Sequence, residues 1–544
     1  MADDADKTPL GRLVGFLAAE QPAGSQLRAA AALLVLVCIS LRCALGLHPH
    51  SGMGKPPMFG DFEAQRHWME LTTALPLGDW YRDTPQNDLQ YWGLDYPPLT
   101  AYHSWLCGKV LGWLEPASMA LLDSRGYEQP ALKTAMRATV LVGDVLIFFP
   151  AVFLFVRAFY AGASPRRRLW IAAAALLQPP LLLIDHGHFQ FNAISLGLHA
   201  LGLTALVRAA GARRASGATD ALATVLICLG VNYKQMSLYL VWPPFVYLLA
   251  KNLYGPRPLS GVLLLAAAVI ATFALCWLPF LLEPEPLTAV GHVLRRQFPF
   301  DRGLYEDKVA NVWCSLSLVL KLKQLLAPAA LLKLCLGATM ASLLPPSVLL
   351  ARRPTPHNLL AASVCCGLGF FLFSFQVHEK SILLPLLPAS LLLGSSPFAG
   401  CWLLTVGSFS MFPLLQKDGL TLAYTAAIIG FHVLVAPRSS GWRYVDNARR
   451  LSLLGMVAIH ALAALTEPPV SSRDRLQTAP LAGLRFHTPM SLCFQPRYPD
   501  LYTYAFAVYS CAHFLMFYGY YLLLQWQAAS PTPLSKDDPK AGLR

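Results

Sequence analysis

The chain has 544 residues, of which 55% are hydrophobic and only 13% are charged. Soluble domains carry about 25% charged residues, so this composition excludes an ordinary soluble protein and indicates an integral membrane protein. The net charge of +13 does not indicate a nucleic-acid partner, because the lysines and arginines lie in short clusters between apolar runs, as the positive-inside rule places them. We expect the lipid bilayer as a partner and no nucleic acid.

Apolar runs of about 20 residues, the length that crosses a bilayer, recur from near residue 29 almost to the C-terminus. Residues 1–28 are expected to be cytosolic, and the run over 29–47 lacks an evident cleavage site, which predicts a retained signal anchor. Residues 48–135 then form a large loop on the opposite, luminal side. We predict an all-α polytopic fold with about fourteen transmembrane helices in one domain over 29–525.

The remaining spans follow from the alternation of basic clusters. Residues 283–325 are expected to be luminal, with 309–325 re-entrant or interfacial, because a span there would put Arg352 and Arg353 on the wrong side. The tail 526–544 is expected to be cytosolic. The expected spans cover 136–158, 169–184, a helix ending near Arg208, 219–232, 237–250, 260–280, 326–349, 358–376, 381–396, 398–415, 420–437, 450–466 and 502–525.

With this topology, the polar clusters all fall on the luminal side. Ionisable groups at membrane depth are costly and usually mark a substrate path or a catalytic site. Their convergence from distant parts of the chain therefore predicts one active site. The clusters are "GDFEAQRHWME", "LDYPP", "DHGHFQFN", "NYKQM", "RRQFPFDRGLYEDK" and "HEK".

Asp61, which follows Gly60 in the first cluster, has two interpretations. It is either a helix N-cap or a general base that takes a proton from an acceptor hydroxyl. Partial desolvation is expected to raise its pKa and strengthen it as a base. Glu63, His67 and Glu70 share one face of the following helix, and we expect that face to be solvated rather than to bind a metal.

The next clusters indicate sugar and phosphate recognition. Prolines hold Asp95 on a stiff turn beside aromatic rings, a combination that suits the C–H faces and hydroxyls of a sugar. The "DHGHFQFN" side chains are possible metal ligands, but hydrogen bonding is the better interpretation, so no metal is predicted. Basic groups suit an anionic phosphate. Besides Asp61, the candidate site residues are Trp92, Asp95, Tyr96, His103, Asp185, His186, His188, Lys234, Arg295, Arg296, Glu306, His378, Glu379 and Lys380.

Most of the twelve cysteines lie inside apolar runs, where a thiol behaves as a small hydrophobe. Cys107 and Cys493 lie outside them and would be able to pair if both face an oxidising lumen. The sequence leaves this pairing open.

Eight stretches resemble one family over residues 53 to about 420: "GDFEAQRHWMELT", "NDLQYWGLDYPPLTAYHS", "SRGYE", "DHGHFQFN", "NYKQM", "CWLPF", "DRGLYEDKVANVWCS" and "FLFSFQVHEKSILLPLLP". They resemble the endoplasmic-reticulum α-1,3-glucosyltransferases that use dolichyl phosphate glucose and add the first glucose to the nine-mannose lipid-linked oligosaccharide. The resemblance weakens over residues 1–28 and beyond about 440, and leaves their roles open.

This resemblance implies a GT-C-type membrane glycosyltransferase in the endoplasmic-reticulum membrane, with its catalytic Asp in the first luminal loop. The implied reaction transfers glucose from dolichyl phosphate glucose to the dolichyl-pyrophosphate-linked nine-mannose oligosaccharide, with inversion and without a cofactor. Two alternatives stay open. One is the related transferase that adds the second glucose, and the other is a polytopic transporter, in which intramembrane Asp and His side chains relay protons.

Overall fold

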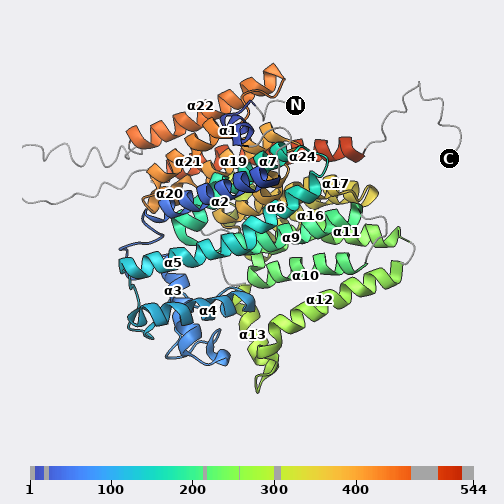
Figure 1. Ribbon diagram of the computed structural model, residues 1–544. Coiled ribbons are helices and arrows are strands. Elements are labelled where there is room, and N and C mark those ends of the chain that lie inside the picture. Colours follow the sequence, from blue (N-terminus) through green and yellow to red (C-terminus); the bar gives the residue numbers. More distant parts are fainter. Residues whose placement is uncertain are drawn as a thin grey trace, which may run out of the picture.

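The computed structural model describes residues 7–17, 24–211, 217–255, 258–298, 308–466 and 500–529. In this part of the chain the regular elements are α-helices with short 3-10 and π-helical turns (η). Figure 1 shows the long helices stacked side by side in one bundle, with α3 and α4 together at its lower left. The expected all-α fold is confirmed.

Proline begins many of the helices because its fixed φ suits the first turn and its missing N–H is not needed there. The N-terminal part holds α1 (Pro9–Leu17), α2 (Gly24–Gly46), α3 (Asp61–Ala74), η2 (Leu77–Asp79), α4 (Pro98–Leu114), η3 (Pro116–Met119), α5 (Pro130–Gly143), η4 (Asp144–Phe148), α6 (Phe149–Phe159), α7 (Pro165–Leu176), α8 (Pro179–Leu181), η5 (Leu182–Phe189) and α9 (Asn192–Gly211).

The remaining helices continue the bundle toward the C-terminus. They are α10 (Gly217–Tyr233), η6 (Gln235–Leu240), α11 (Trp242–Leu253), α12 (Pro258–Leu281), α13 (Pro286–Gln297), α14 (Val312–Leu316), α15 (Leu322–Leu325), α16 (Pro328–Arg352), α17 (Pro356–Phe373), η7 (Glu379–Ile382), α18 (Leu383–Leu391), α19 (Pro397–Ser410), α20 (Phe412–Lys417), α21 (Thr421–Leu434), α22 (Arg443–Leu465) and α24 (Leu501–Ala529).

Nine helices of the described chain are long and apolar enough to cross a membrane, and α10 and α21 are shorter apolar helices. Several expected spans are instead divided into shorter helices, as where η7 leads into α18 and where α19 leads into α20, which has Pro413 in its first turn. The protein is a multi-pass membrane protein, while the expected number of about fourteen spans stays a prediction.

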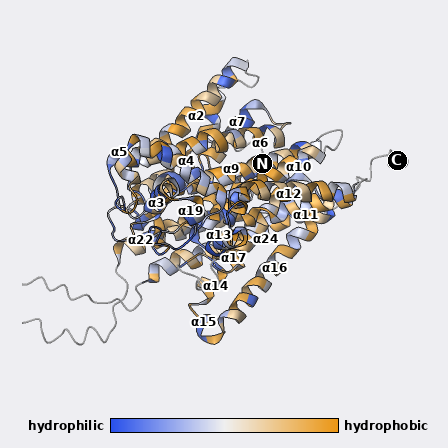
Figure 2. Ribbon diagram, turned by 90° about the horizontal axis from the view of Figure 1, so that it is seen from below, coloured by the Kyte–Doolittle hydropathy of each residue, from blue (hydrophilic) through white to orange (hydrophobic). Residues whose placement is uncertain are grey.

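The outer helices present apolar side chains rather than polar ones. On α12, Leu263, Ile270 and Leu275 are 58%, 68% and 71% exposed. Figure 2 shows the same apolar colour along α12 and α16. Exposed apolar surface of this extent is unfavourable in water and suits contact with lipid chains.

The segment 309–325, which we expect to be re-entrant or interfacial, contains two short helices, α14 and α15. Neither is long enough to span a bilayer. The position of this segment relative to the membrane stays a prediction.

Cysteine labelling tests the topology. With the exposed Cys43 replaced, Asp83→Cys and Val319→Cys are expected to react with an impermeant thiol reagent from one side of the membrane only. Ala161→Cys, in the α6–α7 loop, is the matched control and is expected to react from the other side. Reaction of all three from the same side would refute the arrangement.

Candidate active site

Asp61 begins helix α3 and directs its carboxylate away from that helix. The N-cap is Gly60, and the Asp61 backbone N–H donates to Ser51 Oγ at 3.2 Å. The carboxylate contacts side chains from distant parts of the chain instead of the α3 backbone. The N-cap interpretation of Asp61 is therefore wrong.

Three donors from two other segments meet the Asp61 carboxylate, and all of them reach Oδ2. Lys380 Nζ lies at 2.5 Å and His188 Nε2 at 3.0 Å, and the Gln190 side-chain amide also donates to Oδ2. The Asp61 and Lys380 side chains are each 21% exposed. The centre of the site is thus an ion pair that is reachable from outside.

The charge environment of Asp61 differs from the one expected. Burial raises its pKa, but the charges of Lys380 and His188 and their hydrogen bonds outweigh burial and hold the pKa well below its usual value. The pKa of Lys380 is raised in turn, because the charge of Asp61 outweighs burial. The expectation that desolvation makes Asp61 more basic is therefore wrong.

Lys234 is a buried second lysine, which is linked to the Asp61–Lys380 pair through Gln190. Its ammonium donates to Gln190 Oε1 at 3.1 Å and to Asn192 Oδ1 at 2.6 Å, and it lies 4.9 Å from the centre of the Tyr96 ring. Burial, followed by repulsion from Lys380, lowers the pKa of Lys234 to about 8. Gln190 therefore links the two lysines to the carboxylate.

The ring of His188 continues the network on its other side. His188 Nδ1 lies 2.5 Å from Asp418 Oδ2, and Asp418 is buried at the end of α20. The imidazole is thus held between the carboxylates of Asp61 and Asp418.

The other two candidate site residues of "DHGHFQFN", Asp185 and His186, contact different partners. Asp185 accepts from Asn192 Nδ2 and from the backbone N–H of Ala193, both at 2.7 Å, and so fixes the start of α9. His186 Nε2 lies 2.9 Å from Asp144, which also pairs with Arg42. The site at Asp61 receives only His188 from the three candidates.

The loop with Asp95 is held in place by hydrogen bonds to its backbone carbonyls and from its side chains. Gln235 Nε2 donates to the Asp95 carbonyl at 3.0 Å, and the Tyr96 hydroxyl lies 3.4 Å from Gln190 Oε1. Trp92 donates to the carbonyl of Met58, and Arg296 Nη2 donates to that of Gly93 at 2.7 Å. Arg296 thereby anchors α13 to this loop rather than reaching Asp61.

The remaining candidates lie further from Asp61 or in part of the chain that is not described. His103 Nδ1 faces the Tyr233 hydroxyl at 3.0 Å, and Arg295 is exposed on α13. His378 and Glu379 are half-buried at the start of η7, just before Lys380. Glu306 and Cys493 lie outside the described residues, so the Cys107–Cys493 pairing stays a prediction.

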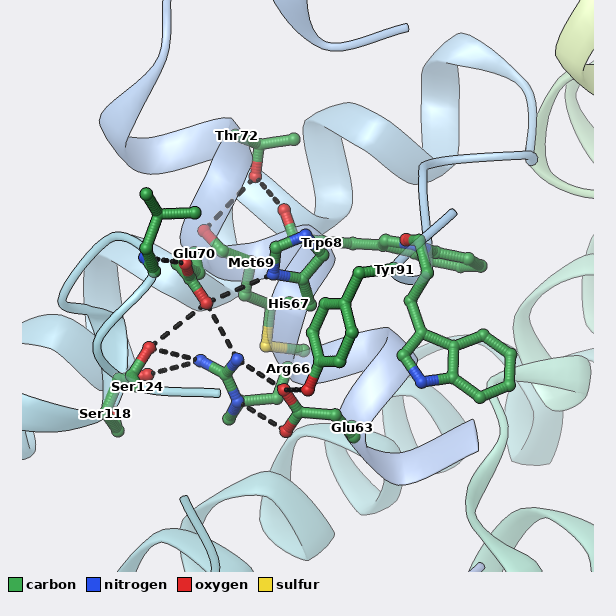
Figure 3. Close-up of polar contacts among 12 residues, drawn as sticks. Glu63, Arg66, His67, Trp68, Met69, Glu70, Thr72, Tyr91, Ser118 and Ser124 are labelled. Carbon is green, nitrogen blue, oxygen red and sulfur yellow. Dashed lines mark hydrogen bonds and ion pairs between the residues drawn. The ribbon is translucent and has the colours of Figure 1, made fainter. Parts of the chain in front are cut away.

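The charged face of α3 is buried, so the expectation of a solvated face is wrong. Figure 3 shows Arg66 between Glu63 and Glu70, with contacts of 2.6 and 2.7 Å. The Arg66 guanidinium also donates to Ser118 O and to Ser124 Oγ. Helical spacing predicts that these groups share a face, but the loop around residues 118–124 covers it.

Burial raises the pKa of Glu70, but the hydrogen bond from His67 and the charge of Arg66 lower it to about 2. Glu70 is consequently ionised at neutral pH, and the cluster of Glu63, Arg66 and Glu70 fixes α3, with Asp61 at its start, against the rest of the loop.

Sequence reasoning missed Gln190, Asn192 and Asp418 as members of the network. Gln190 and Asn192 lie in the motif "DHGHFQFN". Their position beside the candidate residues Asp185, His186 and His188 would have allowed their prediction. Asp418 offered no such signal, because it follows an apolar helix and resembles an ordinary loop carboxylate.

Chelation tests the role of metal. Because Asp185, His186 and His188 face separate partners, we expect activity to persist in EDTA after metal removal is verified by elemental analysis. Loss of transfer in EDTA and its recovery with Mn²⁺ or Mg²⁺ would contradict this prediction.

Fold and site together define a multi-pass, all-helical membrane protein with one carboxylate-centred polar site. The model of the ALG6, ALG8 glycosyltransferase family matches residues 35–520, and the chain belongs to this family. It is thus a membrane glycosyltransferase, and the transporter alternative is not favoured.

Similar proteins cover most of the chain. A Gallus gallus protein named dolichyl pyrophosphate Man9GlcNAc2 alpha-1,3-glucosyltransferase is 43% identical and covers 91% of this chain and 96% of its own length. A Saccharomyces cerevisiae protein of the same name is 42% identical over 74% of this chain and 75% of its own. The crystal structure of ArnT from Cupriavidus metallidurans is 14% identical, covers 91% of this chain and 76% of its own, and has a TM-score of 0.40.

Proposed function

We propose that the protein transfers glucose from dolichyl phosphate glucose to the dolichyl-pyrophosphate-linked nine-mannose oligosaccharide and forms an α-1,3 bond with inversion. The single observation that carries this proposal is the name shared by relatives that are at least 42% identical and cover most of the chain. That name specifies the nine-mannose acceptor and so favours the first-glucose transferase over the second-glucose alternative. The proposed location is the endoplasmic-reticulum membrane, with the site facing the lumen.

Asp61 is the proposed general base. The acceptor hydroxyl oxygen attacks C1 of glucose, the bond from C1 to the phosphate oxygen breaks, and its electron pair leaves with dolichyl phosphate. The hydroxyl proton passes to Asp61. The phosphate is a good leaving group, so no acid needs to protonate it. The partial exposure of Asp61 supports access by an acceptor.

The two lysines are the proposed partners of the donor phosphate. Lys380 now neutralises Asp61, and Lys234 lies behind it across Gln190. A phosphate bound beside Lys380 draws its ammonium away from Asp61, which raises the basicity of the carboxylate. Donor binding and activation of the base are thereby linked.

The direct test is an assay of the purified protein in detergent or nanodiscs with dolichyl phosphate glucose and the nine-mannose lipid acceptor. Formation of a product that carries one additional α-1,3-linked glucose is expected. A preparation that glucosylates only an acceptor already ending in glucose would refute the proposal in favour of the second-glucose enzyme.

His378 is expected to assist donor binding, because it lies at the start of η7 just before Lys380. His378→Ala should raise the KM for dolichyl phosphate glucose about 10-fold, the effect of one lost hydrogen bond to a charged group. His292→Ala, at a half-buried position on α13, is the matched control and should leave this KM unchanged. Native kinetics at limiting donor would remove His378 from the donor site.

A further inference from the structure

Both ring nitrogens of His188 face a carboxylate. Nε2 lies 3.0 Å from Asp61 Oδ2, and Nδ1 lies 2.5 Å from Asp418 Oδ2. The His188 side chain is only 2% exposed, and the Asp418 side chain is 4% exposed. Water is thus excluded from the contact between the imidazole and the second carboxylate.

This arrangement constrains the protons of His188. An ionised carboxylate only accepts hydrogen bonds, whereas a neutral imidazole donates from one nitrogen and presents a lone pair at the other. With two ionised carboxylates, both contacts are hydrogen bonds only when His188 carries both ring protons. Asp418 thereby favours the doubly protonated ring and fixes its orientation.

The orientation of the His188 ring determines which oxygen of Asp61 accepts its hydrogen bond. Among the described residues, the side-chain donors to its carboxylate all reach Oδ2: Lys380, His188 and Gln190. We infer that Asp418 is a positioning residue, which holds the Nε2–H of His188 on Asp61 Oδ2 and so presents Oδ1 to the acceptor hydroxyl. This inference rests on the proposed role of Asp61 as the base.

The backbone places Asp418 for this role. Asp418 is the C-cap that follows α20, and the next residue, Gly419, has φ of 75°, a left-handed conformation in which the chain turns sharply after the helix. The N–H of Leu420 then donates to Leu415 O at 2.8 Å and closes the turn. The Asp418 carboxylate is thus held by a closed helix end rather than by an open loop.

Charged and titratable groups from several elements surround the two side chains. On the side of Asp61, Lys380 Nζ lies 3.4 Å from His188 Nε2. On the other side, Arg137 of α5 donates to Gly187 O at 2.7 Å, and its charge interacts with that of Asp418. Burial lowers the pKa of the nearby His50 to about 4, so this ring is neutral at neutral pH. Because the cations persist when Asp418 is neutralised, removal of its charge should release a ring proton from His188 at lower pH.

The experiment compares pH profiles of kcat for native protein and Asp418→Asn with the donor and acceptor named above. The Asn amide carries no charge, so it no longer stabilises the doubly protonated ring, and His188 loses a ring proton at lower pH. Neutral His188 carries one ring proton, and whenever Nδ1–H donates to the Asn oxygen, the lone pair of Nε2 faces Asp61 Oδ2. We expect the high-pH fall of kcat in Asp418→Asn to shift to lower pH, so that kcat is reduced at pH 8 and recovers toward pH 6, with an unchanged KM for the donor.

Controls separate this effect from a loss of folding. Asp418→Glu keeps the carboxylate and should retain the native pH profile, and Asp123→Asn, at an exposed position, should match the native protein throughout. Should Asp418→Asn not fold, Asp418→Ser replaces it, because its hydroxyl is polar but likewise carries no charge. An Asp418→Asn or Asp418→Ser profile parallel to the native one would overturn the inference. Absence of transfer by the native protein would instead refute the proposed function.

Discussion

Replacement of Asp61 by Asn is expected to lower the rate of glucose transfer by about 10² to 10⁴, the usual contribution of a positioned general base. The amide keeps the shape of the side chain but cannot take a proton from the acceptor hydroxyl. It also keeps an oxygen that accepts from Lys380, so the folded protein should persist. Transfer is measured with both lipid substrates at saturating donor.

Asp95→Asn is the comparison variant, because Asp95 is the other candidate acidic site residue of the loop over residues 48–135 and its charge acts on Lys234. Loss of the ion pair in Asp61→Asn is expected to cost about 1–2 kcal/mol of stability, since the pair is partly exposed to water. Near-native transfer by folded Asp61→Asn, together with inactive Asp95→Asn, would move the base to Asp95.

Arg66→Met is expected to destabilise the protein by about 3–5 kcal/mol, since it leaves two buried carboxylates without their cation. The guanidinium is fully buried and donates to Glu63 at 2.6 and 2.7 Å and to Glu70 at 2.7 Å. Chemical unfolding in detergent, followed by tryptophan fluorescence, measures the loss.

Arg295→Met, at an exposed position on α13, is the matched control and should change stability by less than about 0.5 kcal/mol. Addition of Glu63→Gln and Glu70→Gln to the Arg66→Met protein should recover part of the loss, because the uncompensated charges are then removed. A native unfolding curve for Arg66→Met would show that the cluster does not stabilise the loop.

The sequence allowed much of the fold to be predicted, because long apolar runs have few alternatives to helices in a bilayer. It also allowed prediction that Asp61, His188 and Lys380 lie on one side of the membrane, since charge bias fixes the direction of each crossing. The structure places these three side chains in contact.

Other features depended on contacts that no local pattern encodes. The spacing of Glu63, Arg66 and Glu70 predicts that they share one helix face. That this face is buried depends on the loop around Ser124, which packs over it. In the same way, the pKa of Asp61 depends on Lys380, which is 319 positions away in the chain. The apolar sequence around Asp61 predicts that its carboxylate is partly removed from water. The cation that outweighs this effect on its pKa is identified only in the folded structure.

The order in which these side chains leave the ribosome follows from their positions. Asp61 enters the membrane system first, His188 and Gln190 follow, and Lys380 and Asp418 come only with the later helices. A nascent chain that ends before residue 380 holds the Asp61 carboxylate but lacks its lysine partner, and one that ends before residue 418 also lacks the second carboxylate on His188. The complete network therefore forms only after residue 418 has been added to the chain.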